Sequence, residues 1–454
     1  MSSESTVMTI EEAIDQIGIG RFQHKLLVIA GLGWAADAME VSIVAFVLPS
    51  IIAQWALSPL QASGIGTAIF VGMLIGAWFW GRLSDRIGRK FGFQVTILID
   101  SVFGFLSALS PNYLFLLITR TITGFGVGGT LPVDYSIFAE YLPTKDRGRW
   151  LVLLESFWAL GVIVVAGLAW LIIPRFDFGW RLLLALSAVP GVLIFFIRRY
   201  VPESPRYLLI DGREEEARQV LQQVAAENGV SLHIDRLKAQ PRNESVNVRT
   251  LLKAPFLRTT LMLWVAWFAI SFGYYGTLIW LPGIFFERGF DFVRTYQNTF
   301  ILALAQLPGY FSAAYLVERW GRKRTLTIYL LFSGAFTFVF ALVNDLPLIV
   351  TAASLMTFFT LGAWGVLYAY TPELYPTEIR ATGMGAASGM TRVAGAIAPI
   401  IAGFLLPLSL VAPLALFAVA FLVGAGAVFF FGQETQNVPL EETVKADPQP
   451  SPAR

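Results

Sequence analysis

Two segments of this chain recur at one fixed offset of 233 residues. Residues 82–90 (RLSDRIGRK) reappear at 315–323 (YLVERWGRK), and residues 140–147 share a Glu, a Pro, a Thr and an Arg with residues 373–380 in the same register. Segments that repeat at one spacing over this length indicate the duplication of a whole structural half. The chain is therefore expected to fold as two related halves joined by a connecting segment.

Both halves are expected to lie in a membrane. Of the 454 residues 56% are hydrophobic, and the mean hydropathy is +0.64. This is more apolar side chain than a soluble core can bury, and the apolar runs reach the roughly 20 residues that a helix needs to cross a bilayer. The sequence predicts an all-α membrane protein with twelve transmembrane helices in two pseudo-symmetric six-helix halves. The predicted spans are 25–53, 61–82, 91–109, 113–142, 149–173, 180–200, 257–286, 294–316, 324–343, 346–375, 380–406 and 410–432.

The distribution of Lys and Arg predicts the orientation in the membrane. These residues concentrate in 82–90, 145–149 and 319–324 and in the long segment 201–256, which lie in alternate loops. Positively charged loops stay on the cytoplasmic side. We therefore expect a multi-pass membrane protein with both termini in the cytoplasm.

The composition argues against several other classes of protein. The chain has no cysteine, and its two histidines, His24 and His233, lie outside the spans, so neither a thiol nucleophile nor a metal site is expected. A net charge of +2 gives no nucleic-acid signal. The first apolar run is long and contains two acidic residues, unlike a cleaved signal peptide. We expect neither enzyme activity nor a cofactor.

Five segments follow from this pattern. They are a cytoplasmic N-terminal segment (1–24), a first six-helix half (25–200), a cytoplasmic linker with short helices (201–256), a second six-helix half (257–432) and a disordered cytoplasmic tail (433–454). The tail is predicted to be disordered because it is polar and rich in proline.

The linker is expected to contain a short helix that begins near Asp211 and ends at Asn228. Glu214 and Arg218 are spaced for an i,i+4 ion pair, and Leu221 and Val224 belong to a narrow apolar stripe. One interpretation is a cytoplasmic latch that joins the halves and packs its stripe under the helices. The alternative is a solvated linker whose helix is incidental.

The duplicated unit with charged loops on one side resembles the major facilitator superfamily. Residues 81–90 and their copy match its loop motif between the second and third helix of each half, and Arg120 with the glycines that follow it matches its fourth-helix motif. Residues 202–206 (PESPR) and 433–435 (QET) match the sugar-porter branch and its relatives. The resemblance implies two halves that rock about a central site and a monomeric protein.

Finer features resemble one subgroup of that superfamily. These are residues 31–40 in the first helix, 155–159 in the fifth, 274–276 in the seventh and 370–376 at the end of the tenth. The subgroup contains the bacterial niacin transporters and the animal synaptic vesicle protein two with its relatives, and the niacin transporters are the most similar. The resemblance implies a transporter of the bacterial inner (plasma) membrane.

The repeated charges lie where helices leave the membrane. In the family, such residues pair between neighbouring helices and hold the cytoplasmic side shut while the site faces outward, so they are interpreted as a cytoplasmic gate. The alternative is that they only set the topology. The residues are Asp85, Arg89, Glu140 and Arg147 with their copies Glu318, Arg322, Glu373 and Arg380.

Five charged residues inside the spans are not repeated. Asp37, Glu40, Arg120 and Glu155 map onto Ile270, Gly273, Ala353 and Ser388 in the second half, and Arg392 maps back onto Ala159. Each such charge costs about 2.5–3.5 kcal/mol at the bilayer centre and usually faces a bundle interior or water. Because the shared architecture does not require them, these residues are assigned to the transport path.

Asp37 and Glu40 lie three residues apart on one face of the first helix. Two carboxylates on one face raise each other's affinity for a proton, so one of them is predicted to carry the coupling proton. The resemblance agrees, because related aromatic-acid symporters carry paired acids in this helix. The alternative is a structural ion pair with Arg120 or Arg392. Arg120 itself resembles the family's fourth-helix arginine, which serves proton coupling or packing, and Asp134 has no assigned role.

Arg392 is predicted to anchor the substrate. It lies in the middle of the eleventh span among glycines and alanines, and a guanidinium offers planar, bidentate pairing to a carboxylate. The alternative is an ion pair inside the membrane with Glu155 or Asp37.

A set of aromatic residues is predicted to line the central cavity by alignment to the subgroup. Trp158 lies one turn from Glu155, Trp364 lies one turn from Tyr368, and Tyr274 and Tyr275 are expected at a break in the seventh helix beside Gly273 and Gly276. Such rings can stack on a flat aromatic ligand. Trp34 and Trp264 are interpreted as packing residues.

The resemblance and these residues predict secondary active import of nicotinate (niacin) or a similar small aromatic carboxylate, by proton symport and alternating access. The alternative is a carrier of organic cations or of other aromatic acids. A binding or receptor protein that does not transport is a third, less favoured interpretation. A sugar porter is disfavoured because the seventh helix presents Phe272, Tyr274 and Tyr275 instead of clustered amides.

Overall fold

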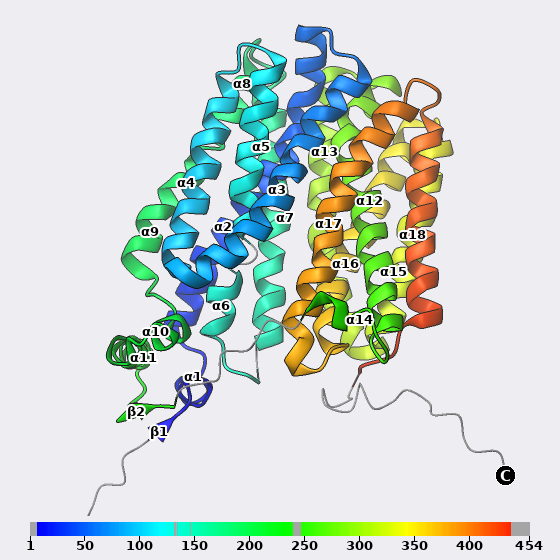
Figure 1. Cartoon of the computed structure of the whole chain (residues 1–454). Helices are drawn as coiled ribbons and strands as arrows, with labels where there is room; N and C mark the ends of the chain where they lie inside the picture. Colours follow the sequence, from blue (N-terminus) through cyan, green and yellow to red (C-terminus); the bar gives the residue numbers. More distant parts are fainter. Residues whose placement is uncertain (1–6, 131–132, 134, 146, 239–246, 437–454) are drawn as a thin grey trace, which may run out of the picture. The chain divides into compact units, whose positions relative to one another are not determined.

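The structure is a computed structural model that describes residues 7–130, 133, 135–145, 147–238 and 247–436. It is almost entirely helical, and the described part contains one pairing of two short strands (Figure 1). Within this part, eleven helical segments are long and apolar enough to cross a membrane. The predicted all-α membrane fold is therefore confirmed. The predicted span that is not among the eleven is the fourth, 113–142, whose helix 113–130 contains Arg120 and several glycines.

The elements follow the predicted order. The first part of the chain holds β1 (Val7–Met8), α1 (Ile10–Ile17), α2 (Arg21–Trp55), α3 (Pro59–Ile87), α4 (Arg89–Ala108), α5 (Tyr113–Thr130), α6 (Ser136–Glu140), α7 (Arg147–Ile172), α8 (Gly179–Leu186), the short 3-10 helix η2 (Val189–Val192) and α9 (Leu193–Tyr200). The connecting segment holds α10 (Pro205–Ile210), α11 (Glu214–Glu227), β2 (Arg236–Leu237) and the 3-10 helix η3 (Val248–Thr250). The last part holds α12 (Leu257–Glu287), α13 (Phe292–Leu304), α14 (Gln306–Trp320), α15 (Arg322–Leu342), α16 (Leu346–Glu373), α17 (Thr377–Leu405) and α18 (Val411–Phe431).

The helix ends agree with the predicted spans to within a few residues, and three spans are divided. The spans 113–142 and 294–316 each contain two described helices, and the span 180–200 contains α8, η2 and α9. The tail beyond residue 436 lies outside the described residues, as do Asp134 and residues 239–246 of the linker.

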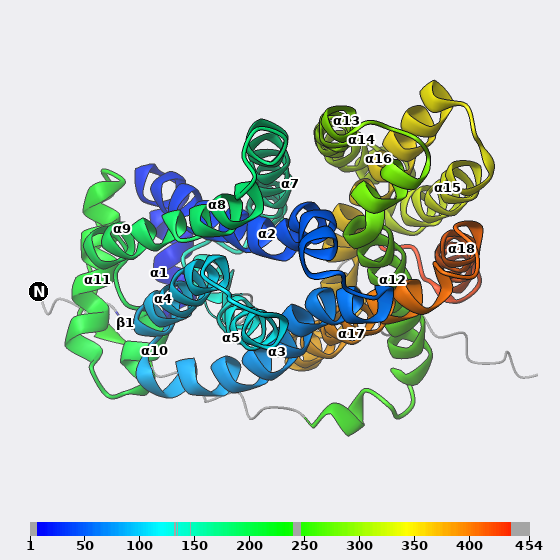
Figure 2. The same cartoon turned by 90° about the horizontal axis from the view of Figure 1, so that it is seen from above.

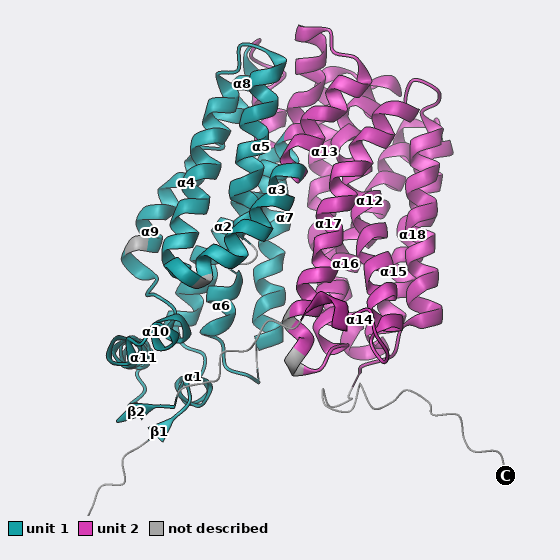
Figure 3. Ribbon diagram, in the orientation of Figure 1, with its two compact units in different colours: residues 1–43, 71–165, 178–243 teal, residues 44–70, 166–177, 244–454 magenta. Residues whose placement is uncertain are grey.

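The helices form two compact units, which we describe separately (Figure 3). Unit 1 comprises residues 1–43, 71–165 and 178–243, and unit 2 comprises residues 44–70, 166–177 and 244–454. The boundary between the units therefore crosses α2, α3 and α7, whereas the sequence repeat divides the chain within the linker.

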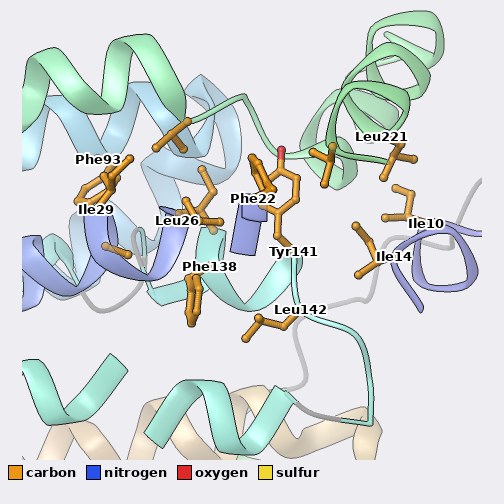
Figure 4. Packing of buried hydrophobic residues seen from close by; sticks show 14 of the residues in the cluster. Ile10, Ile14, Phe22, Leu26, Ile29, Phe93, Phe138, Tyr141, Leu142 and Leu221 are labelled. Carbon is orange, nitrogen blue, oxygen red and sulfur yellow. The ribbon is translucent and has the colours of Figure 1, made fainter. Parts of the chain in front are cut away.

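One end of unit 1 carries a layer of short elements. β1 pairs with β2 in parallel, with Val7 opposite Arg236, and Thr9 begins α1 with a capping box to Glu12. Ile10 and Ile14 of α1 lie with Leu221 of α11 in one buried apolar cluster that continues to the ends of the long helices (Figure 4). The N-terminal segment is thus part of this layer.

The apolar stripe of the linker packs as predicted. Leu221 and Val224 are buried in this cluster, so the helix is not an incidental one in a solvated linker. The predicted pair of Glu214 with Arg218 is wrong, because Glu214 accepts the backbone amide of Leu237 at 2.7 Å. Arg218 pairs with Glu215 instead, one residue further along.

In unit 2, α15 packs against both α16 and α18, and α12 packs against α17 and α18 (Figure 2). The parts of α2 and α3 that belong to this unit contact the second half of the chain. Tyr296 Oη donates to the Phe46 carbonyl at 2.8 Å, and Thr67 Oγ1 donates to the Ala396 carbonyl at 2.9 Å. A Cβ placed on Gly66 would lie 3.1 Å from Ile279, so a small residue lets α3 and α12 approach closely.

Candidate functional site

An ion pair joins α2 and α5 inside unit 1. Arg120 Nη1 lies 2.6 Å from Glu40 Oε2, and Arg120 Nη2 donates to the backbone carbonyl of Glu40 at 2.6 Å. Both side chains are 1% exposed. The alternative given above for Glu40, an ion pair with Arg120, is therefore present in the structure. A carboxylate and a guanidinium this deep require each other's charge.

Two further carboxyl groups lie close to this pair. Asp37 is 4% exposed on α2, and Asp100 is 2% exposed on α4. Asp100 is near enough to Glu40, Asp37 and Arg120 to interact with each of them electrostatically. Asp100 was not predicted as a site residue, although it shows the same signal as Asp37 and Glu40. It is a carboxylate inside a predicted span, and its counterpart at the 233-residue offset is Ser333.

Glu155 and Trp158 lie on α7 next to α2. Gly161 allows this contact, because a Cβ at that position would meet Ala38 at 2.8 Å. Glu155 is 2% exposed and lies against Trp34 of α2. The Trp34 ring is 5.9 Å from the Trp158 ring and 6.3 Å from the Tyr135 ring. Trp34, interpreted above as a packing residue, therefore lies with the predicted site residues of unit 1.

In unit 2, three rings form a cluster between α12 and α16. The Trp267 ring centroid is 5.5 Å from that of Trp364 and 4.9 Å from that of Tyr368, and the last two are 6.0 Å apart. Trp267 Nε1 donates to Thr371 Oγ1 at 2.9 Å, which fixes its ring. The structure brings Trp364 and Tyr368 together as predicted from their spacing, and it adds Trp267. Nothing in the sequence distinguished Trp267 from the many other aromatic residues of the apolar spans.

The expected break at Tyr274 and Tyr275 is wrong. The helix α12 is continuous through both residues, which are buried. The glycines beside them serve close packing instead, because a Cβ on Gly273 or Gly276 would overlap a phenylalanine ring of α18. The Tyr275 ring packs against Phe70 of α3 with a centroid distance of 4.6 Å.

Arg392 lies on α17 in unit 2. Its side chain is 7% exposed, and Nη1 donates to the Ser388 carbonyl one turn earlier at 2.9 Å. Gly385 and Gly389 lie on the same face of the helix. A Cβ on either glycine would have no described atom within 4 Å outside its own helix, so this face of α17 has open space beside the guanidinium.

The repeated charges form the same ion pair in each unit. Arg89 Nε lies 3.5 Å from Glu140 Oε1, and Arg322 Nε lies 3.1 Å from Glu373 Oε2. Glu318, which is largely exposed, lies 3.3 Å from Arg322. The side chain of Asp85, the counterpart of Glu318, lies outside what the structure describes.

Arg147 and Arg380 have equivalent roles at the start of α7 and near the start of α17. Arg147 donates to the Leu142 carbonyl and Arg380 donates to the Tyr375 carbonyl, each at 3.2 Å. Each arginine therefore bonds the backbone of the turn that precedes its helix.

A second repeated contact was not predicted. Glu203, which follows α9, accepts the backbone amides of Arg89 at 2.9 Å and Lys90 at 3.1 Å. Glu434, which follows α18, accepts the amide of Arg322 at 2.8 Å. Each carboxylate thus caps the start of a long helix from elsewhere in the chain, where the helix has free amides and a positive dipole end.

The residue after each capping glutamate completes the network. Ser204 Oγ donates to Glu140, and Thr435 Oγ1 donates to Glu373. The two motifs that resemble the sugar-porter branch therefore connect to the repeated ion pairs through a hydroxyl group. The sequence contained both motifs and the charges, but their contact joins residues more than 60 positions apart.

These groups can bind charges, aromatic rings and protons. Unit 1 contains three buried carboxyl groups around one guanidinium, and unit 2 contains a guanidinium on an open helix face and a cluster of three rings. Groups of this kind suit the binding of an anionic aromatic molecule and the exchange of a proton.

Comparison with known proteins places this arrangement in a family. Residues 35–446 match the family model described as "Sugar (and other) transporter". The niacin transporter NiaP of Acinetobacter baylyi is 40% identical, with 96% of this chain and 99% of that protein covered. Organic cation/carnitine transporter 7 of Arabidopsis thaliana is 35% identical with 100% of both covered, and the synaptic vesicle 2-related protein of Bos taurus is 35% identical with 96% of this chain and 82% of that protein covered.

A solved structure shares the fold. The partially occluded inward-open conformation of the xylose transporter XylE from E. coli superposes with a TM-score of 0.74 at 17% identity, and the match covers 91% of this chain and 98% of that one. The chain is a multi-pass membrane transporter and not an enzyme. It belongs to the sugar (and other) transporter family of the major facilitator superfamily, in the group that contains the niacin transporters and the synaptic vesicle 2-related proteins.

Proposed function

We propose that this transporter imports nicotinate, or a similar small aromatic carboxylate, together with protons across the bacterial plasma membrane. Its similarity to a niacin transporter over nearly the full length of both proteins supports this substrate class. Both termini are assigned to the cytoplasm. The loops rich in Lys and Arg are cytoplasmic, and an even number of spans separates each of them from either terminus, so the termini lie on the same side.

The observation that carries the proposal is Arg392. The guanidinium is buried in α17 beside two glycines that leave space on its face of the helix. A buried cation of this kind can pair with a carboxylate through two parallel hydrogen bonds. We assign Arg392 to the carboxylate of the substrate.

The aromatic residues are assigned to the ring of the substrate. In unit 2, Trp364, Tyr368, Tyr274 and Tyr275 are the predicted set, and Trp267 supports the first two by direct contact. In unit 1, Trp158 and Glu155 occupy neighbouring turns of α7 and complete the predicted set. Offset or edge-to-face contacts contribute about 0.5–1.5 kcal/mol for each ring pair.

The remaining residues are assigned to coupling and gating. Asp37, Glu40 and Arg120 form the proton-coupling group, in which protonation of a carboxyl group changes the charge that Arg120 has to balance. The networks at the helix ends form the cytoplasmic gate, and alternating access requires them to release and re-form. Its residues are Asp85, Arg89, Glu140 and Arg147 with Glu318, Arg322, Glu373 and Arg380.

Binding of candidate ligands to the purified protein tests the substrate assignment. Nicotinate and benzoate are expected to bind, and nicotinamide is expected to bind more weakly because it lacks the charge that Arg392 pairs with. Arg392→Gln should weaken nicotinate binding by about 2–5 kcal/mol, as for the loss of one partner of a buried charge pair. Equal binding of the acid and the amide, unchanged in Arg392→Gln, would contradict the assignment.

An organic cation is the second candidate. The Arabidopsis relative carries that description, and the carboxyl groups of unit 1 can balance a positive charge. Competition with a quaternary ammonium compound separates the two substrates. Displacement of nicotinate by the cation in wild type, but not in Glu40→Gln, would favour this candidate.

A further inference from the structure

Asp100 is a buried carboxyl group on α4 that the proposed coupling group does not yet include. It is 2% exposed, and its Oδ1 atom has no hydrogen-bond partner among the described residues. Gly126 of α5 brings the helices together here, since a Cβ on it would lie 2.9 Å from the Asp100 amide nitrogen. Burying an ionised carboxylate with an unsatisfied oxygen raises the free energy of the fold strongly, whereas burying a neutral carboxylic acid raises it much less.

The ion pair beside Asp100 also contains an unsatisfied oxygen. Glu40 Oε1 is buried without a partner in the described part of the chain, and it faces α4 one turn from Asp100. A Cβ on Gly104 would lie 2.6 Å from this oxygen and 2.5 Å from Ser187 Oγ. Glu40 therefore uses one oxygen for Arg120 and presents the other to the helix that carries Asp100.

The charges that act on Asp100 come from α2 and α5. Glu40 and Asp37 are the carboxyl groups that act on it, and Arg120 is the cation that does. Because Arg120 already bonds both the carboxylate and the backbone of Glu40, its charge is committed to that pair. A second buried carboxylate beside this pair is costly, whereas a protonated and neutral Asp100 is much less so.

The charged residues at the two ends of α4 lie too far away to compensate. Glu140 of α6 pairs with Arg89 at the start of α4, and Arg181 of α8 donates to the Ala108 carbonyl at its end. These contacts lie eight or more residues from Asp100, which is at least about 12 Å along a helix. From α9, Arg199 lies over the Tyr200 ring.

We infer that Asp100 is a proton-carrying residue of this transporter, neutral while Arg120 is paired with Glu40. The inference rests on the proposed proton-coupled function and adds a third helix to its coupling group. On loading, a proton from water bonds to the Asp100 carboxylate and neutralises it. On release, the O–H bond breaks and the proton returns to water on the other side of the membrane. The resulting carboxylate is attracted electrostatically to Arg120. The step transfers a proton and no electrons.

The test compares wild type with Asp100→Asn, which is uncharged like the protonated acid. Both are placed in liposomes with radiolabelled nicotinate, and uptake against a concentration gradient is driven by an inward proton gradient. For an anion moving with one proton, wild type should accumulate on the order of tenfold for each pH unit. Accumulation by the Asp100→Asn variant should fall to about onefold. Its counterflow exchange at equal pH should be kept, because this exchange needs no net proton movement. Concentrative uptake equal to wild type would overturn the inference.

Two further variants separate this role from a structural one. Ser101→Ala changes the neighbouring buried polar residue of α4 and should behave as wild type in both assays. If Asp100→Asn fails to fold, Asp100→Glu keeps a carboxyl group and should retain concentrative uptake with a shifted pH profile. An unchanged pH profile in Asp100→Glu would count against the inference. Uptake that follows a sodium gradient instead of the proton gradient would also overturn it.

An infrared measurement keeps the inference testable if nicotinate is not the substrate. Wild type that moves no nicotinate in either assay would contradict the proposed function alone. The carbonyl stretch of a protonated carboxylic acid should then still be present in wild type and missing in Asp100→Asn. Identical spectra in this region would overturn the role of Asp100 whatever the substrate is.

Discussion

Glu203 accepts a hydrogen bond from the backbone amide of Arg89 at 2.9 Å, across 114 positions of the sequence. The helix α4 begins at Arg89 after Gly88, which has no side chain to cap it and has a φ of 98°. The remote carboxylate therefore supplies the cap. The same arrangement recurs at Gly321, with Glu434 as the cap, so the duplication preserved this contact as well as the charges.

Gly88→Ala and Gly321→Ala should each destabilise the protein. Both glycines have positive φ angles that a residue with a Cβ rarely adopts, which costs about 1–3 kcal/mol. A Cβ at either position would also overlap the capping glutamate. Thermal unfolding in detergent measures the effect. Gly426→Ala in α18 is the matched control, because its Cβ would meet nothing and alanine favours a helix; destabilisation of the control by the same amount would contradict this reason.

Arg120→Ala should destabilise the protein strongly, because it leaves Glu40 buried without its partner. Loss of one member of a buried pair costs about 3–5 kcal/mol. The double variant Arg120→Ala with Glu40→Gln removes the stranded charge and should unfold at a higher temperature than Arg120→Ala alone. If the double variant is less stable than Arg120→Ala alone, the stranded charge of Glu40 does not account for the destabilisation.

Glu140→Gln and Glu373→Gln test the cytoplasmic gate. Each change weakens one ion pair and one hydroxyl contact at the helix ends, and none of these groups belongs to the predicted substrate site. Nicotinate affinity should stay unchanged, while the transport rate should fall by about fivefold or more, since the ion pairs bias one conformation over another. Binding and counterflow kinetics on the same preparation provide the comparison, and parallel loss of affinity and rate would argue for a structural role.

A disulfide between α3 and α17 should stop transport. A Cβ on Gly403 would lie 2.9 Å from the Ser63 Cβ, so the two helices need to move apart by only about 0.6–0.9 Å to reach the separation of about 3.5–3.8 Å found in disulfides. Alternating access requires these helices to separate, so oxidised Ser63→Cys/Gly403→Cys should be inactive and should recover with a reductant. The chain has no other cysteine, so each single variant is a clean control. Full transport by the oxidised double variant would show that these helices remain together throughout the cycle.

The long helices could be predicted from the sequence because each span is an unbroken apolar run bounded by polar or charged residues. The ends of α12, α15 and α18 differ from their predicted spans by at most two residues. The repeated ion pairs were also predictable, because duplication places the same charges at the same helix ends. These features depend on local composition and on one offset.

The missed features depend on contacts between distant parts of the chain. The docking of α1 on α11 and the caps from Glu203 and Glu434 join segments that sequence spacing does not relate. The glycines of α12 resemble a break in sequence, but their role depends on rings that α18 presents to them. Asp100 could have been found, because it satisfies the same criterion as Asp37 and Glu40.

Uptake of radiolabelled nicotinate into proteoliposomes, with and without an inward proton gradient, tests the central claim most directly. Arg392→Ala, shown to be folded by its thermal unfolding, is the paired variant. We predict gradient-driven accumulation in wild type and its loss in Arg392→Ala. Uptake that is indifferent to the gradient would contradict proton coupling, and wild-type protein that binds nicotinate without moving it would contradict transport.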